Sequence, residues 1–265
     1  MQTHVKTQIP PGSFTATLVG LFEKGLRYST VIDVGCADGH FYVYHSELGL
    51  FTGSTLLNID ANAIYEPSLK AIKDVMGGHY VIAAASDRAS TAILTTAVHP
   101  YWGSLRPAGD RYWEHNNDLR EGTIEVPTVT LDGLAKSLGL AGPFLLKLDV
   151  QGAEAEVLHG ARDVLRQTHV VICEVDLDDF QTINEILVDA GFGLFDLTNP
   201  NWVFDRSLGW FYPVYLNRSL DRLRPRGLWD VAHNQAIVKA QVDRRRTIRE
   251  QLARALAQQR AARSR

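Results

Sequence analysis

Short apolar runs rich in β-branched residues alternate with stretches of helical periodicity along most of the chain. Apolar residues between Phe14 and Tyr28 recur at helical spacing, which predicts a leading helix. Further helices are expected within 67–75, after the strand at 143–150 as far as Gln167, and over Asp178–Ala190. The strand-like runs lie at 30–39, 55–60, 79–87, 143–150, 169–177, 192–198 and 209–216. This alternation indicates an α/β fold with an open, mainly parallel sheet covered on both faces.

The helical rhythm breaks between residues 89 and 129. Two runs there, 90–98 and 122–131, resemble strands, and a long linker with aromatic and polar residues joins them. Long connections inside a domain are usually functional or disordered, so we expect a loop or hairpin on the acceptor side of a binding site. Residues 1–234 are expected to form the main domain, and 235–265 a separate basic helix.

Composition and charge narrow the class of protein. Hydrophobic residues make up 45% of the 265 residues and charged residues 22%, as in globular proteins. The sequence contains no apolar run of the roughly 20 residues needed to span a bilayer, and its first residues lack the features of a signal peptide. Two cysteines outside any C-x-x-C pair favour neither a disulfide scaffold nor a zinc site. We therefore expect a cytoplasmic protein.

Charge is unevenly distributed along the chain. Residues 241–265 contain eight arginines and two acids, a local charge of +6 within a formal net charge of −3. The remaining 240 residues therefore carry −9. An acidic body argues against nucleic acid as a partner. The basic helix could pack on a second subunit, giving a homodimer, or on a carrier-bound anionic acceptor; it could also remain solvated or bind RNA, although the acidic body argues against RNA.

Acids stand at the ends of the first three expected strands. The first strand leads into Asp33-Val-Gly35-Cys-Ala-Asp38-Gly39, whose glycine spacing differs from the G-x-G-x-x-G of dinucleotide binders. Asp60 follows Gly39 by 21 residues, the range in which a strand-end acid reaches ribose hydroxyls. S-adenosylmethionine fits this pattern, because acids at the turn suit its cationic amino-acid portion better than a pyrophosphate. The candidate cofactor-binding residues are Asp33, Gly35, Cys36, Asp38, Gly39, Asp60, Ala61, Ser86, Asp87 and Asp149. The alternative is that these acids only cap turns.

Three polar residues, Lys147, Asp149 and Gln151, interrupt an otherwise buried strand, and burying charge is costly unless it is paired or used. The stretch 128–161, with its Thr-Leu-Asp and its Lys-x-Asp-x-Gln-Gly-x-Glu, closely resembles the signature of the FkbM-type methyltransferases. The similarity extends from about Val31 to Glu174. It implies a class I methyltransferase fold, which is a Rossmann-like three-layer sandwich with a seven-stranded, mainly parallel sheet whose last strand is antiparallel. It also implies methyl transfer from S-adenosylmethionine, typically to a hydroxyl.

Methyl transfer to oxygen requires alignment and removal of the hydroxyl proton. We take Asp149 as the first candidate for the residue that orients or deprotonates the acceptor, with Lys147 holding its charge. His40 and His99 are rival bases. Asp149, Glu174 and His99 could gather a divalent cation, but the spacing does not require one and none is expected.

The acceptor is expected to be a small molecule or carbohydrate. Aromatic residues with polar tips in the insert could stack on sugar rings, or could form a small core of their own. Tyr112 and Trp113 belong to this aromatic group, and Arg106, like Ser104, could bind the cofactor carboxylate or acceptor hydroxyls. The expected substrate-binding residues are Gln151, Glu154, Glu174, Tyr101, Trp102 and Ser104. The prediction is therefore an O-methyltransferase acting on a sugar or natural product. Its alternatives are an N-methyltransferase on the same fold and a non-catalytic adenosyl-binding module whose helix docks a partner.

Overall fold

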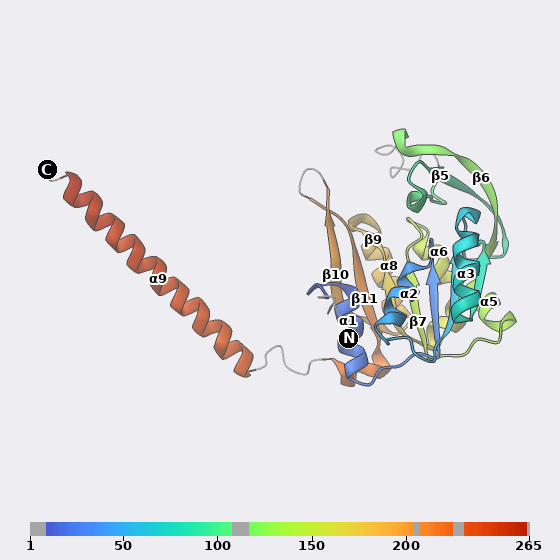
Figure 1. Cartoon of the computed structure of the whole chain (residues 1–265), viewed down its shortest axis with the longest axis horizontal. Helices are drawn as coiled ribbons and strands as arrows, with labels where there is room; N and C mark the ends of the chain where they lie inside the picture. The colour runs from blue at the N-terminus through green and yellow to red at the C-terminus, as the bar shows by residue number, and fades with distance from the viewer. Residues whose placement is uncertain (1–8, 108–116, 204–206, 225–230, 264–265) are drawn as a thin grey trace, which may run out of the picture. The chain divides into compact units, whose positions relative to one another are not determined.

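The computed structural model describes residues 9–107, 117–203, 207–224 and 231–263. The chain divides into two compact units, Met1–Leu223 and Arg224–Arg265 (Figure 1). In the second unit, the described residues form one helix, α9 (Val231–Arg263), on which Val238, Val242, Ile248 and Leu252 are exposed. None of the described helices is both long and apolar enough to cross a membrane.

The first unit is built on a central sheet with seven strands in the order β10-β11-β8-β7-β1-β2-β3, and a short eighth strand beside β11. The neighbours from β8 to β3 pair in parallel, whereas β11 is antiparallel to both β8 and β10. The expected sheet with an antiparallel last strand is thus confirmed, and the eighth strand is an addition to it. The strands are β1 (Thr30–Val34), β2 (Thr55–Asp60), β3 (His79–Ile82), β7 (Phe144–Leu148), β8 (Thr168–Cys173), β9 (Val175–Asp176), β10 (Phe192–Trp202) and β11 (Leu208–Asn217).

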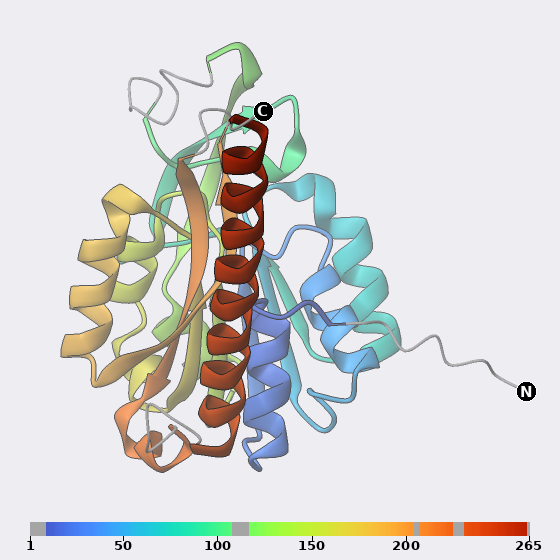
Figure 2. The same ribbon diagram turned by 90° about the vertical axis from the view of Figure 1, so that its left-hand side faces the viewer.

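Helices cover both faces of this sheet, which gives three layers (Figure 2). One core lies under α5 (Leu131–Ser137), α6 (Glu154–His159), α7 (Arg162–Arg166) and α8 (Leu177–Asp189). The other lies under α1 (Phe14–Glu23) and α2 (His40–Glu47), and α3 (Glu66–Met76) packs near the first turn. The β7 and β8 strands are buried on both faces, as their apolar runs require.

The helix expected to run as far as Gln167 is divided into α6 and α7 near Gly160. A side chain at Gly160 would overlap the carbonyl oxygen of Ser86, so the glycine lets these two backbone segments approach. The residues from 79 to 87 also form two strands, β3 in the central sheet and β4 (Ala84–Ala85) in another.

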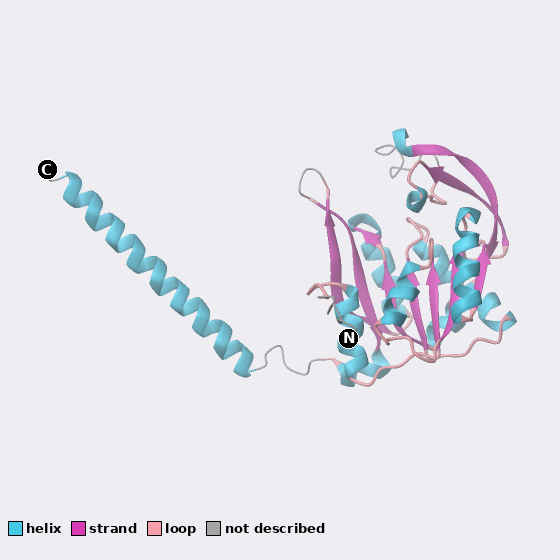
Figure 3. Cartoon of the chain, viewed as in Figure 1, coloured by secondary structure: helices cyan, strands magenta, loops and turns pink. Residues whose placement is uncertain are grey.

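The insert forms a second, smaller sheet of three strands (Figure 3). In it β5 (Ser90–Ala97) and β6 (Arg120–Val129) are antiparallel, and β4 pairs with β6. Two short 3-10 helices, η2 (Pro100–Trp102) and η3 (Asn117–Leu119), lie in the connection between β5 and β6. The chain therefore leaves the central sheet after β3, passes through β4, β5 and β6 of the smaller sheet, and then enters α5.

Candidate active site

A large cleft opens at the carboxyl ends of the central parallel strands. Its volume is about 1750 Å³, above the roughly 300–1,000 Å³ of most small-molecule sites, so it has room for two ligands side by side. Ligands of open α/β sheets usually bind at this edge. Among the residues expected from the sequence, the cleft is lined by Gly35, His40, Asp60, Ala61, Tyr101, Trp102, Lys147, Asp149, Gln151, Glu154 and Glu174.

Lys147 is the buried positive charge of the site. In the register of β1 and β7, it stands opposite Asp33. Its Nζ atom lies 3.2 Å from Asp33 Oδ1 and 3.3 Å from Asp149 Oδ2, and it donates to the Gly35 carbonyl at 3.4 Å. Burial alone would lower the pKa of Lys147, but Asp149 and Asp33 outweigh it and raise the pKa above its usual value. The ammonium group therefore stays charged between two carboxylates.

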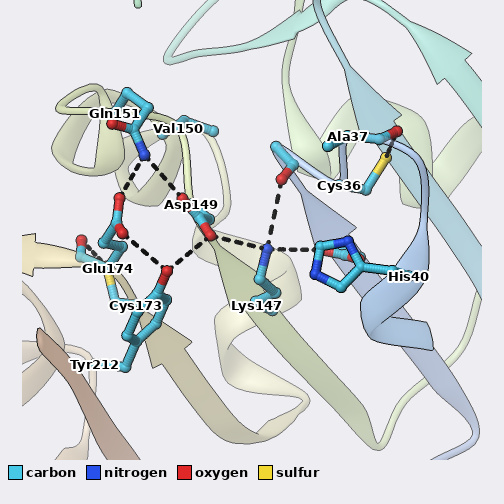
Figure 4. Close-up of polar contacts among 12 residues, drawn as sticks. Cys36, Ala37, His40, Lys147, Asp149, Val150, Gln151, Cys173, Glu174 and Tyr212 are labelled. Carbon is cyan, nitrogen blue, oxygen red and sulfur yellow. Dashed lines mark hydrogen bonds and ion pairs between the residues drawn. The ribbon is translucent and has the colours of Figure 1, made fainter. Parts of the chain in front are cut away.

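Next to Lys147, four side chains form a connected group that we call the carboxylate cluster: Asp149, Gln151, Glu174 and Tyr212 (Figure 4). Gln151 Nε2 donates to Asp149 Oδ1 at 3.1 Å and to Glu174 Oε2 at 2.5 Å. The Tyr212 hydroxyl lies 3.1 Å from Asp149 Oδ2 and 2.8 Å from Glu174 Oε1. The phenol and the amide thus bridge two acids that would otherwise repel each other.

The pKa values of the two acids of the cluster are shifted in opposite directions. Burial raises the pKa of Glu174 well above its ordinary value, and the neighbouring Asp149 raises it further. For Asp149, burial is outweighed by Lys147 and by hydrogen bonds from its neighbours, so its pKa is lowered. Asp149 is therefore the ionised member of the pair, and Glu174 favours the protonated form.

Asp60 lies at the other end of the cleft, beside small apolar side chains. Its Oδ2 accepts a hydrogen bond from Ala37 N and its Oδ1 one from Asn62 N, both at 2.8 Å. Each carboxylate oxygen keeps a further lone pair for a ligand. The neighbouring wall is formed by Ala37, Ala61, Tyr65, Ala83, Ala84, Ala85, Leu94 and Leu105. An apolar wall beside an acid suits an adenine ring and its ribose, so the residues present fit S-adenosylmethionine.

The glycines of the first turn meet other protein atoms. Gly35 and Gly39 have φ values of +68° and +81°, which side chains rarely adopt. A side chain at Gly35 would overlap the carbonyl of Asp149, and one at Gly39 would overlap Ile72. Both glycines were expected at the cofactor. The structure gives packing as a reason for both, and of the two only Gly35 lines the cleft.

Three other residues expected at the cofactor do not line the cleft. Asp33 is fully buried in its ion pair, and Cys36 is a buried free cysteine. Asp38 contacts two residues of the cleft lining, with Oδ1 at 2.8 Å from His40 Nδ1 and Oδ2 at 3.2 Å from the Tyr101 hydroxyl. The expected contact with a cationic ligand therefore has no support from the buried position of Asp33, whereas Asp38 stays next to the cleft.

Glu154 begins α6 as a buried side chain. Its Oε1 accepts hydrogen bonds from Val150 N at 3.1 Å and Gly152 N at 3.3 Å. Burial raises the pKa of Glu154 from an ordinary 4.5 to about 7. Its main visible role is to hold the loop between β7 and α6.

The remaining expected residues are more scattered. His40 is exposed at the cleft, whereas His99 stacks on Trp102, with ring centroids 5.0 Å apart, and does not line it. Ser104 is buried and donates to the Gln151 carbonyl at 2.6 Å. Ser86 and Asp87 follow β4 outside the cleft, and Tyr112 and Trp113 lie outside the described residues. No group of three or more His, Cys, Asp or Glu side chains in the described part of the chain is arranged to hold a metal ion.

Tyr212 was missed by the sequence reasoning. It belongs to β11, in which Phe211 pairs with Val175 and Val214 with Ile172, so that Tyr212 comes beside Glu174. The available signal was a tyrosine within the apolar run expected to form the last strand. Only the pairing of β11 with β8 and β9 gives that tyrosine a place in the site.

Comparison with known proteins gives one specific match. The family model of the methyltransferase FkbM domain matches residues 33–194, from the first turn of the cleft to β10. This range includes all of the carboxylate cluster except Tyr212. A search of curated protein sequences gives no match.

Several solved structures are similar at low identity. Methyltransferase FkbM from Methylobacillus flagellatus KT is 16% identical, with 71% of this chain and 43% of that chain covered and a TM-score of 0.41. Precorrin-6y C5,15-methyltransferase from Geobacter metallireducens GS-15 is 12% identical, with 80% and 93% covered and a TM-score of 0.39. Fibrillarin from Aeropyrum pernix, with natively bound S-adenosyl-L-methionine, is 14% identical, with 74% of each chain covered and a TM-score of 0.39. These likenesses are too weak to inform on ligands, so the domain match is what bears on function.

Proposed function

The chain belongs to the family of methyltransferases with an FkbM domain, and from this premise we propose that it methylates a hydroxyl group of a sugar or natural-product acceptor, with S-adenosylmethionine as the donor. The observation that carries the proposal is the carboxylate cluster at the base of the cleft, with Lys147 beside it. Holding a nucleoside alone would not require this group.

The cofactor supplies a methyl group activated by a sulfonium charge. Asp60 keeps carboxylate lone pairs with which it would accept hydrogen bonds from the ribose hydroxyls, and the apolar wall beside it is suited to the adenine. Gly35 and Lys147 line the path from this end of the cleft to Asp149. The end of the cleft near Asp60 would therefore bind the methyl donor, and the end near the carboxylate cluster would bind the methyl acceptor.

Asp149 is the residue proposed to act on the acceptor. Its side chain is 21% exposed and ionised, and it is fixed by hydrogen bonds from Gln151 and Tyr212 and by the ion pair with Lys147. It accepts a hydrogen bond from the acceptor hydroxyl and aligns the oxygen. When S-adenosylmethionine is bound and supplies the methyl group, Asp149 would take up the proton that the acceptor hydroxyl loses. Such a base contributes roughly 10²- to 10⁴-fold to a rate.

The other members of the cluster keep Asp149 in this state. Lys147 favours its ionised form, and Tyr212 and Gln151 set its orientation. Glu174, in its favoured protonated form, adds no second negative charge next to Asp149. The hydroxyl group of the substrate can thus donate a hydrogen bond to one carboxylate, that of Asp149, whose position is fixed.

The test is transfer of labelled methyl from S-adenosylmethionine to a panel of hydroxylated glycosides and of amines. Wild type should label hydroxyl acceptors, Asp149→Asn should lose about 10²-fold or more of that rate, and the exposed control Asp163→Asn should keep it. Labelling of amines alone would replace the proposal with N-methylation. Cofactor binding without transfer to any acceptor in a broad panel would favour the non-catalytic module.

A further inference from the structure

Arg106, in the insert, reaches across the edge of the cleft. Its Nη2 is paired with Asp179 in the first turn of α8, and its side chain is largely buried. The guanidinium lies against Gly152, where any side chain would overlap the arginine Nε. A planar guanidinium fits this narrow space and pairs with a carboxylate at the same time. Gly152 therefore leaves the space that the arginine fills.

Ser104 joins the insert to the same loop. Its hydroxyl accepts a hydrogen bond from Arg106 N at 3.0 Å and donates to the Gln151 carbonyl at 2.6 Å. Its backbone is held by Thr95 through two hydrogen bonds, of 2.9 and 3.0 Å. The insert thus contacts the segment Gln151–Gly152 through Ser104 and Arg106, and Ser104 is in turn hydrogen-bonded to strand β5 of the smaller sheet.

Gln151 needs this support because its backbone is strained. Its φ is +55°, a value that residues other than glycine adopt at a cost of order 1–3 kcal/mol. Its side chain is also the one that bridges Asp149 and Glu174. The main chain of one residue is therefore held by the insert, while its amide group positions both acids of the carboxylate cluster.

We propose that Arg106 is a positioning residue, which docks the insert on the Gln151–Gly152 segment and so holds Gln151 in the conformation that orients Asp149 and Glu174. The insert then has a second role besides covering the cleft. The carboxylate cluster is then correctly assembled only when the insert is docked. The inference goes beyond the proposed function, because it holds for any acceptor.

Hydrogen exchange on the full chain tests this coupling. Two amides report on the loop, since Val150 N and Gly152 N both donate to Glu154, and two report on the insert, Ser104 N and Arg106 N. Arg106→Ala should speed exchange at all four by about tenfold. The milder Asp179→Asn should act in the same direction if the alanine variant does not fold.

Charge reversal separates positioning from general stability. The double variant Arg106→Asp with Asp179→Arg should return the exchange rates toward wild type, because the ion pair is rebuilt in reverse. Arg166→Ala removes an exposed ion pair with Asp163 on α7 and should leave the exchange rates of all four amides unchanged. Faster exchange in the insert with wild-type rates at Val150 and Gly152 would overturn the proposal. So would unchanged rates at all four amides, or no recovery in the reversed pair.

Discussion

Asp33 and Lys147 stand opposite each other on the parallel strands β1 and β7, and the Lys147 ammonium lies 3.2 Å from the Asp33 carboxylate. Both side chains are almost completely buried. The pair joins β1, which leads into the first glycine-containing turn, to β7, which leads to the candidate base Asp149. It thus connects the packing of the sheet with the electrostatics of the cleft.

Replacing Lys147 should destabilise the protein strongly. Lys147→Met leaves Asp33 and Asp149 as buried acids without their cation, and breaking a buried pair in this way costs about 3–5 kcal/mol. Urea unfolding should show this loss, whereas Lys136→Met, at an exposed position of α5, should change the free energy of unfolding by less than about 0.5 kcal/mol. Equal stability of the two variants would contradict the assigned role.

Glu154 should make stability depend on pH. Its pKa is raised by burial to about 7, so the folded state binds a proton more tightly than the unfolded state. Its contribution is complete below pH 4.5 and is lost as the pH rises through 7, by about 3 kcal/mol in total. Glu154→Gln keeps the uncharged shape, so the difference in unfolding free energy between wild type and variant should fall across this range. A constant difference from pH 4 to 8 would show that Glu154 is an ordinary ionised acid.

Tyr212 should contribute through its hydroxyl. Tyr212→Phe removes the donor between Asp149 and Glu174 and should cost about 1.5–3 kcal/mol of unfolding free energy, the range for hydrogen bonds to charged groups. The control is Tyr215→Phe, whose hydroxyl makes a long contact of 3.4 Å with Asn184 and should matter less. An equal or smaller loss in the Tyr212 variant would contradict its place in the cluster.

Gly35 should tolerate no side chain. Gly35→Ala combines an unfavourable φ with overlap of the Asp149 carbonyl, whereas Gly49→Ala has a similar φ, +78°, and open space. Both variants carry a backbone cost of roughly 1–2 kcal/mol, and the Gly35 variant should lose at least as much again through the collision. Equal melting temperatures of the Gly35→Ala and Gly49→Ala variants would show that Gly35 is not in close contact with the Asp149 carbonyl.

The sequence was sufficient for the order of the elements. The apolar runs of β7 and β8 and the helical spacing in α8 are local patterns, and each becomes the expected element. The family motif also led to Lys147, Asp149 and Gln151, which the structure brings together with Glu174, another residue expected at the site.

Relationships between distant strands were not accessible in this way. Asp33 was expected to face a ligand, but the register of β1 and β7 turns it toward Lys147. Tyr212 enters the site only because antiparallel β11 pairs beside β8 and β9. Asp87 was expected at the cleft, yet the chain leaves the central sheet after β3, so that this acid follows β4 outside the cleft. Such differences depend on pairing and register, which single-strand patterns do not encode.

Calorimetric titration of S-adenosylmethionine, S-adenosylhomocysteine and NAD into wild type, Asp60→Ala and Asp87→Ala tests the central claim most directly. Wild type should bind both adenosyl ligands and not NAD. Asp60→Ala should weaken adenosyl binding by about 10- to 100-fold, through the lost hydrogen bonds to ribose, while Asp87→Ala should bind as wild type does. Folded wild-type protein that binds neither adenosyl ligand, or an Asp60→Ala variant that binds them unchanged, would contradict the assignment of this cleft.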